Sequence, residues 1–157
     1  MKEEVFFLKY AFPCSFILLD RKEITKEELD KLEKAVVNEE VLDREYLEKI
    51  YFRAFQKIEK FANELKKDKW DLEVLKKYFI EEHNCIINEG KYAYAKAPES
   101  LKNLCKVHKA KVLEIKDEVL IVEYDGNKKR PVMKLLVPGV VVNDIVTIHY
   151  GYAIEKL

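Results

Sequence analysis

The chain is poor in glycine and cysteine and has no long apolar run, and each shortage excludes a class of protein. Four glycines in 157 residues leave little material for the glycine-rich loops that cradle phosphates. Three cysteines, an odd count, fit reduced thiols better than a disulfide framework. No stretch reaches the roughly 18–20 apolar residues of a membrane span, and no signal-peptide pattern is visible. We therefore expect a cytoplasmic protein that does not enter the membrane.

The chain also has no net excess of positive or negative charge. The 29 Lys and Arg residues balance 29 Asp and Glu residues, which argues against a nucleic-acid partner held by electrostatic attraction alone. No Ser-His-Asp spacing, phosphate loop or paired-carboxylate motif stands out, so the sequence does not predict an enzyme. Apolar residues make up 48% of the chain, which is typical of a chain that folds.

Helical periodicity runs through residues 22–87. The run Thr25–Glu28 has the spelling of a capping box, in which the threonine and glutamate side chains satisfy backbone N–H groups at the start of a helix. It predicts a first helix from near Lys26 to about Val37. The segment before it, around Pro13, is expected to be extended or to form a turn.

Two further helices are expected downstream. Asp43 is a plausible N-cap for a second, longer helix, and Asp68 or Asp71 for a third. Apolar residues recur at three- and four-residue steps in the second helix: Leu47, Ile50, Ala54, Ile58, Phe61 and Leu65. In the third helix, one face carries Leu72, Leu75, Phe79 and His83. We therefore predict a three-helix domain over residues 1–98.

The pattern changes to short runs rich in β-branched residues after Pro98. The predicted strands are Val107–Ile115, Val119–Tyr124, Arg130–Val137, Ile145–His149 and Tyr152–Ile154. Asp125-Gly126-Asn127 is a strong hairpin signal. Five short strands in about fifty residues suit a small barrel of the OB type. The predicted fold class is α+β, with a helical domain followed by a five-stranded OB-like barrel over residues 101–157.

Histidine and cysteine are scarce, yet they gather at three places in the sequence. His83 and Cys85 end the predicted third helix, Cys105 and His108 open the barrel in a Cys-x-x-His spacing, and His149 lies in a late strand. Thiolate and imidazole together suit iron, zinc or copper(I) rather than magnesium or calcium. These five residues are the candidate metal ligands, for iron or alternatively zinc, bound transiently.

Each candidate also has a structural interpretation. Cys85 precedes two isoleucines, and a free cysteine is usually a small buried hydrophobe. His108 and His149 alternate with apolar residues, as ordinary strand residues do. Cys14, beside Pro13, is expected to be structural or incidental.

Two segments resemble the HypC/HupF family of nickel–iron hydrogenase maturation chaperones, namely Leu104–Ile115 and Asn143–Leu157. Members of that family begin with a Met-Cys pair that runs into a first strand. Their barrel ends with a Gly-Asp, a hydrophobic strand and a His-x-Gly-Phe-Ala-Ile segment. Cys105 falls at the position of the family's cysteine, and His149 at the position of its barrel histidine.

The resemblance implies a metallo-chaperone or assembly factor. Family members bind the iron atom that will receive cyanide and carbon monoxide, and they work with a HypD partner and the hydrogenase large subunit. Carried over, the essential residues are Cys105 and His149. The chain departs from the family because a hundred residues precede the cysteine, Lys109-Ala110 replaces a Pro-Gly, and Asn143 replaces a glycine. Residues 1–100 resemble no family that we recognise.

An interaction module is the alternative interpretation. OB-type barrels often bind single-stranded nucleic acid, and the basic run Lys128–Arg130 follows Tyr124 in the predicted hairpin. The balanced charge of the chain argues against it.

Overall fold

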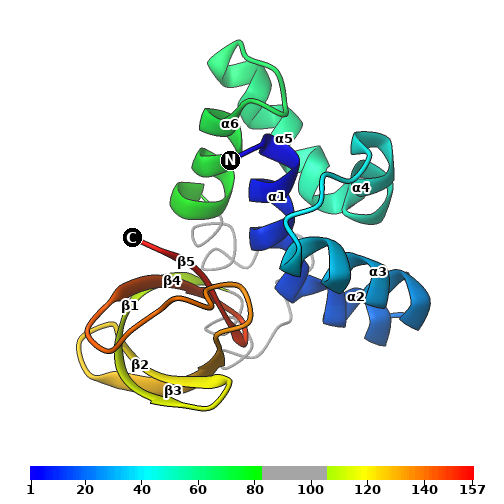
Figure 1. Ribbon diagram of the computed structural model, residues 1–157. Coiled ribbons are helices and arrows are strands. Elements are labelled where there is room, and N and C mark those ends of the chain that lie inside the picture. The colour runs from blue at the N-terminus through cyan, green and yellow to red at the C-terminus, as the bar shows by residue number, and fades with distance from the viewer. Residues whose placement is uncertain (83–105) are drawn as a thin grey trace. The chain divides into compact units, whose positions relative to one another are not determined.

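The chain forms two compact units in a computed structural model, Met1–Cys85 and Ile86–Leu157. The structure describes residues 1–82 and 106–157. Within these residues the first unit is helical and the second holds five strands that close into a barrel (Figure 1). The α+β class and the five-stranded barrel predicted from the sequence are confirmed.

The first helix, α1 (Glu3–Ala11), lies where the sequence predicted an extended or turn segment. Every residue from Glu4 to Ala11 is buried. A helix that is covered on all sides carries no polar stripe, so it lacks the periodicity by which helices are recognised. Its two buried charges are paired: Arg44 Nε lies 2.5 Å from Glu4 Oε1, and Lys9 Nζ lies 2.6 Å from Glu39 Oε1.

Pro13 lies in a short 3₁₀ turn, η1 (Phe12–Cys14), which leads into helix α2 (Ser15–Asp20). Proline is tolerated at the start of a helical turn because its missing N–H would have no partner there. Ser15 is fully buried, and its Oγ lies 2.6 Å from the hydroxyl oxygen of Tyr51. This hydrogen bond ties the start of α2 to a residue thirty-six positions later in the chain.

Helix α3 (Lys26–Val37) begins as the sequence predicts. The Glu28 backbone N–H donates to Thr25 Oγ1 at 3.2 Å, and the Thr25 N–H donates to Glu28 Oε2 at 2.8 Å. Both bonds of the capping box are therefore present.

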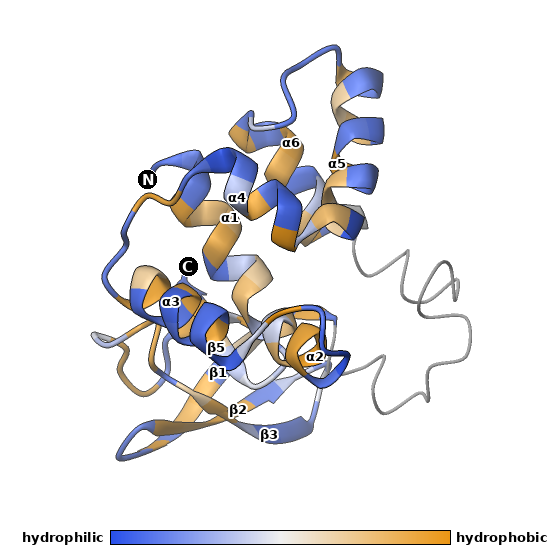
Figure 2. Cartoon of the chain, turned by 90° about the vertical axis from the view of Figure 1, so that its right-hand side faces the viewer, coloured by the Kyte–Doolittle hydropathy of each residue, from blue (hydrophilic) through white to orange (hydrophobic). Residues whose placement is uncertain are grey.

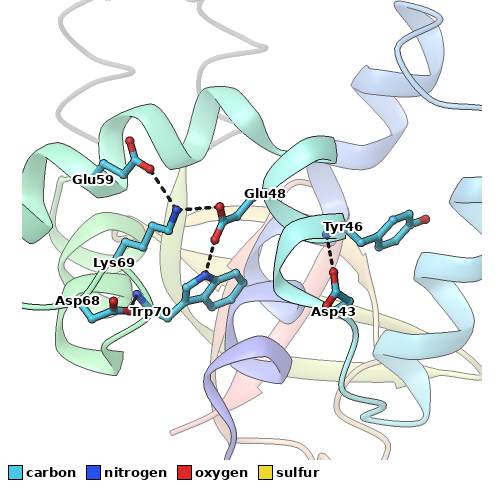
Figure 3. Close-up of polar contacts among 7 residues, drawn as sticks. All are labelled: Asp43, Tyr46, Glu48, Glu59, Asp68, Lys69 and Trp70. Carbon is cyan, nitrogen blue, oxygen red and sulfur yellow. Dashed lines mark hydrogen bonds and ion pairs between the residues drawn. The ribbon is translucent and has the colours of Figure 1, made fainter.

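The predicted second helix is divided at Tyr51 into α4 (Arg44–Ile50) and α5 (Phe52–Leu65). Asp43 caps α4 by accepting a hydrogen bond from the Tyr46 N–H (Figure 3). The N–H of Tyr51 still donates to the Leu47 carbonyl, and the Tyr51 carbonyl accepts from Phe55, so the chain bends rather than unwinds. Hydrophilic residues follow one side of α5 in Figure 2, which agrees with the apolar stripe expected on the other.

Asp71 is the cap of the third predicted helix, because its carboxylate accepts from the Glu73 N–H at 2.8 Å. The helix α6 (Leu72–Lys76) continues as a π-helical segment, η2 (Lys77–Glu82), where the described residues end. Asp68 instead accepts from the Trp70 N–H within the preceding turn.

Aromatic side chains form the core of the helical unit. The ring of Phe7, fully buried, lies within 6 Å of four other rings. These rings belong to Tyr51, Phe55, Trp70 and Phe79. Trp70 is anchored at its edge as well, because its indole N–H donates to Glu48, which also pairs with Lys69 (Figure 3). A residue of α1 thus packs against side chains from several later parts of the helical unit.

The barrel consists of β1 (Val107–Lys116), β2 (Val119–Tyr124), β3 (Lys128–Met133), β4 (Ile145–His149) and β5 (Tyr152–Lys156). The strand order around it is β1-β2-β3-β5-β4, with β4 pairing back to β1. Four of the five strand pairs are antiparallel, and β3 and β5 are parallel. Its interior is filled by small and branched side chains: Ala110, Val112, Leu120, Val122, Val132, Val137, Val140, Val146, Ile148 and Ala153.

Two details of the barrel bear on the sequence predictions. Asp125 and Gly126, in the three-residue loop between β2 and β3, both have positive φ, 47° and 90°, which aspartate and glycine tolerate in tight hairpin turns. The third predicted strand ends at Met133 rather than Val137, because the chain turns there and the Val137 N–H bonds to the Lys134 carbonyl.

None of the helices within residues 1–82 and 106–157 has the length and apolar character that crossing a bilayer demands.

Candidate functional site

Two of the five candidate metal ligands lie in the described part of the chain, and both are in the barrel. His108 is the second residue of β1, and His149 is the last residue of β4. The other three, His83, Cys85 and Cys105, lie outside the described residues. Cys105 stands two positions before Val107, the first residue of β1.

His108 is on the inner side of β1. Side chains alternate between the two faces of a strand, and Ala110 and Val112, on the same face of β1, belong to the barrel core. His108 is opposite Ile148 of β4, another core residue. The residue as a whole is 8% exposed. It therefore occupies the end of the barrel interior, beyond the apolar core.

His149 is on the other side of the sheet. Its neighbours Val146 and Ile148 fill the barrel, and the alternation of β4 turns His149 outward. It is opposite Val107 of β1 and Tyr152 of β5. Its side chain is fully buried even so. The two imidazoles therefore leave the sheet on opposite sides, although they are on neighbouring strands.

A small polar cluster surrounds His108 on the inner side. His108 Nδ1 lies 3.3 Å from Asp125 Oδ1, in the β2–β3 turn. Its ring lies 4.8 Å, between centroids, from that of Tyr124 at the end of β2. Tyr124 is opposite Ala110 in the barrel and packs partly against the core. We call His108, Tyr124, Asp125 and Arg130 the mouth cluster.

Arg130 completes the mouth cluster from β3. It is opposite the core residue Val122, so it shares the inner side of the sheet. Its guanidinium carbon lies 4.9 Å from the centroid of the Tyr124 ring, and Nη2 donates to the Tyr150 carbonyl at 3.0 Å. Cation–π and hydrogen-bond contacts thus hold this arginine inside the mouth.

The basic run singled out in the sequence is thereby divided. Lys128 and Lys129 are exposed, and Lys129 is opposite Glu123 in the β2–β3 ladder. Arg130 is directed inward instead. The sequence alone indicates this, because Arg130 is two positions before the apolar Val132 and so lies on the same face of the strand.

Another charged residue, Asp144, precedes β4. Its carboxylate accepts from the Val141 N–H at 2.8 Å and lies 2.9 Å from Lys156 Nζ. The hydrogen bond from the Val141 N–H, and then the Lys156 ammonium, lower the pKa of Asp144. This arrangement fixes the turn that leads into β4.

No group of three or more histidine, cysteine, aspartate or glutamate side chains converges on a metal-sized space in residues 1–82 and 106–157. His108 and Asp125 supply two donor groups side by side. Cys14, in the helical unit, is half-buried. A complete ligand set drawn from the described residues is thus absent, and a thiolate from Cys105 would add the soft donor that iron or zinc favours.

Comparison with known families agrees with the barrel. Residues 107–157 match the model of the HupF/HypC family, and the N-terminal part has no family match. A search of curated proteins found no match to the chain. The C-terminal third of the chain, which contains all five strands and both described histidines, is thus similar to the HupF/HypC family.

Proposed function

We propose that the chain is a maturation chaperone of the HypC type, which uses the Cys105 thiolate to hold a metal centre or a partner protein during hydrogenase assembly. The observation that carries the proposal is the extent of the family match, which covers the whole barrel from Val107 to Leu157. The match begins two residues after Cys105, and the assignment of Cys105 to the position of the family's cysteine rests on the resemblance of the sequence around it.

The chemistry of the residues supports a metal cargo. A thiolate is both a nucleophile and a soft metal ligand, and metal binding itself favours the deprotonated form. The barrel also supplies two imidazoles. His108 follows Cys105 by three residues in the sequence. His149 occupies the position of the family's barrel histidine. The iron centre is cargo in this scheme, so the site must release it as well as bind it, and few ligands suit that purpose.

Proteins of the family work with other proteins, and we propose the same for this chain. By resemblance, the partners are a HypD-like scaffold and a hydrogenase large subunit. No catalytic step is assigned to the chain, since its task is to carry a centre that other proteins build.

The helical unit has no family counterpart, and we assign it a role in presenting the site. His83 and Cys85 follow its last described residue, Glu82, closely in the sequence. They are the remaining candidates for additional ligands. In this scheme residues 1–98, which include His83 and Cys85, form one domain, and residues 101–157 form the barrel domain.

Single-strand binding by the barrel is the competing function. Its support is the exposure of Lys128 and Lys129. Against it stands Arg130, which donates to the Tyr150 carbonyl and covers Tyr124. The aromatic ring best placed to stack on a base is therefore occupied by a side chain of the barrel itself.

Two measurements on the same protein separate these functions. Protein purified anaerobically from iron-supplemented cells is analysed for bound metal, and its binding to single-stranded oligonucleotides is titrated at several salt concentrations. We expect retained metal, weak oligonucleotide binding, and no change in metal content in the variant Lys129→Ala, since this lysine lies on the outer face opposite Glu123. Metal-free protein with salt-sensitive oligonucleotide binding, weakened by Lys129→Ala, would instead establish the binding module.

A further inference from the structure

The mouth cluster holds a carboxylate–imidazole pair that the family resemblance does not assign. Asp125 Oδ1 lies 3.3 Å from His108 Nδ1, and His108 as a whole is 8% exposed. The two residues come from different elements, the start of β1 and the β2–β3 turn. The barrel register brings them together, because β1 pairs with β2 up to Ala110 and Tyr124, next to Asp125.

From this geometry we infer that Asp125 positions His108 as a metal ligand, with the proton on Nδ1 and the lone pair of Nε2 directed to the ion. The inference rests on the proposed function and deepens it, because it names an imidazole and the residue that orients it. Histidines that bind metals commonly direct their other nitrogen to a carboxylate, which fixes the tautomer and the ring orientation. The chemical class of the ligand is a divalent ion that accepts nitrogen and sulfur donors, such as iron(II) or zinc.

The neighbours of the pair restrict how the ring can move. Tyr124 lies against the imidazole at 4.8 Å between centroids, and Arg130 covers the tyrosine at 4.9 Å. Arg130 is itself held by the Tyr150 carbonyl. Residues of three strands and a turn thus fix the position of the His108 ring. Ordering these side chains costs conformational entropy, and a functional site benefits when the orientation of a ligand ring is fixed.

The conformation of Asp125 itself guides the choice of variants. Its φ is +47°, a left-handed conformation that glycine and asparagine adopt more readily than alanine. Asp125→Gly removes the carboxylate and keeps the turn, and Asp125→Asn keeps an oxygen that can accept from Nδ1–H. Lys128→Ala is the matched control, because Lys128 Nζ lies 3.9 Å from the other carboxylate oxygen, Oδ2.

The experiment records long-range ¹H–¹⁵N spectra of the full-length protein labelled at its three histidines, with each ring assigned by a His→Gln variant. In the metal-free protein we expect His108 to carry its proton on Nδ1. Asp125→Gly should lose this preference, while Asp125→Asn and Lys128→Ala retain it. A His108 ring protonated on Nε2, or unchanged in Asp125→Gly, would overturn the positioning role whatever the function of the protein.

The same samples are then titrated with Zn²⁺, a diamagnetic probe. Zn²⁺ should shift the Nε2 resonance of His108, and Asp125→Gly should weaken binding by about 10- to 100-fold. A His108 resonance that Zn²⁺ leaves unchanged would overturn the ligand role. If that resonance still shifts in Cys105→Ala with wild-type affinity, the thiolate function fails while the His108–Asp125 site stands.

Discussion

Cys105→Ala is expected to abolish retention of metal and of partner protein. The thiolate is the only soft anionic donor at the family position, and the described imidazoles leave the sheet on opposite sides, where a single ion cannot use both equally. A neutral imidazole without the thiolate offers too few donors to hold a soft ion. The measurement is metal content, together with recovery of a co-expressed HypD-like scaffold on the tagged protein.

Cys14→Ala is the matched control for this experiment. It removes one of the three thiols of the chain, a half-buried one in the helical unit. We expect it to retain metal and partner at the wild-type level. His149→Ala tests the family position separately, and a partial loss is expected there, because the thiolate remains. Equal retention by the wild type, Cys105→Ala and His149→Ala would leave the barrel fold as the only property shared with the chaperones.

Phe7→Ala is expected to destabilise the helical unit by about 3–5 kcal/mol, the usual range for removing a buried phenylalanine ring. Phe7 is fully buried, and its ring packs against four aromatic side chains from later in the helical unit. The cavity would therefore open at the point where α1 meets the rest of the unit. A loss of that size is a large share of the stability of a small domain.

The chain provides its own probe for this measurement. Trp70, the single tryptophan, lies 5.5 Å from Phe7 between ring centroids, so its fluorescence follows unfolding of the helical unit. Phe52→Ala is the control, since Phe52 is 44% exposed, and it should cost less than about 1 kcal/mol. Similar midpoints of denaturation for the two variants would show that Phe7 does not hold the core together.

Two kinds of element could be predicted from the sequence: those set by a local turn or capping motif, and those in which apolar and polar residues alternate because one face is buried. The capping box at Thr25 and the hairpin at Asp125-Gly126 each specify a local hydrogen-bond or dihedral requirement, and both are present. The alternating runs of the barrel form strands close to the predicted bounds, except for the third, which ends at Met133 rather than Val137, since one face of each strand meets the core.

The buried helix α1 could not be predicted, because residues 4–11 have no polar face to set the period. The division at Tyr51 was also missed. Its backbone hydrogen bonds continue across the bend, while burial of its ring and the bond to Ser15 are long-range effects. Neither leaves a signal in the local spacing of residues.

The candidate site was predicted in its residue types and only partly in its arrangement. The scarcity of histidine drew attention to His108 and His149, but their opposite directions follow from strand register. The Asp125 contact depends on the pairing of β1 with β2, which brings together residues seventeen positions apart. Spacing along one chain segment does not contain that information.

X-ray absorption at the iron edge, on protein loaded anaerobically with iron(II), tests the thiolate claim most directly. We predict a sulfur atom in the first coordination shell of the wild type and of Cys14→Ala. That sulfur should be lost in Cys105→Ala. A first shell of nitrogen and oxygen alone in the wild type, or a sulfur contribution that persists undiminished in Cys105→Ala, would contradict the assignment of Cys105 as the residue that holds the metal.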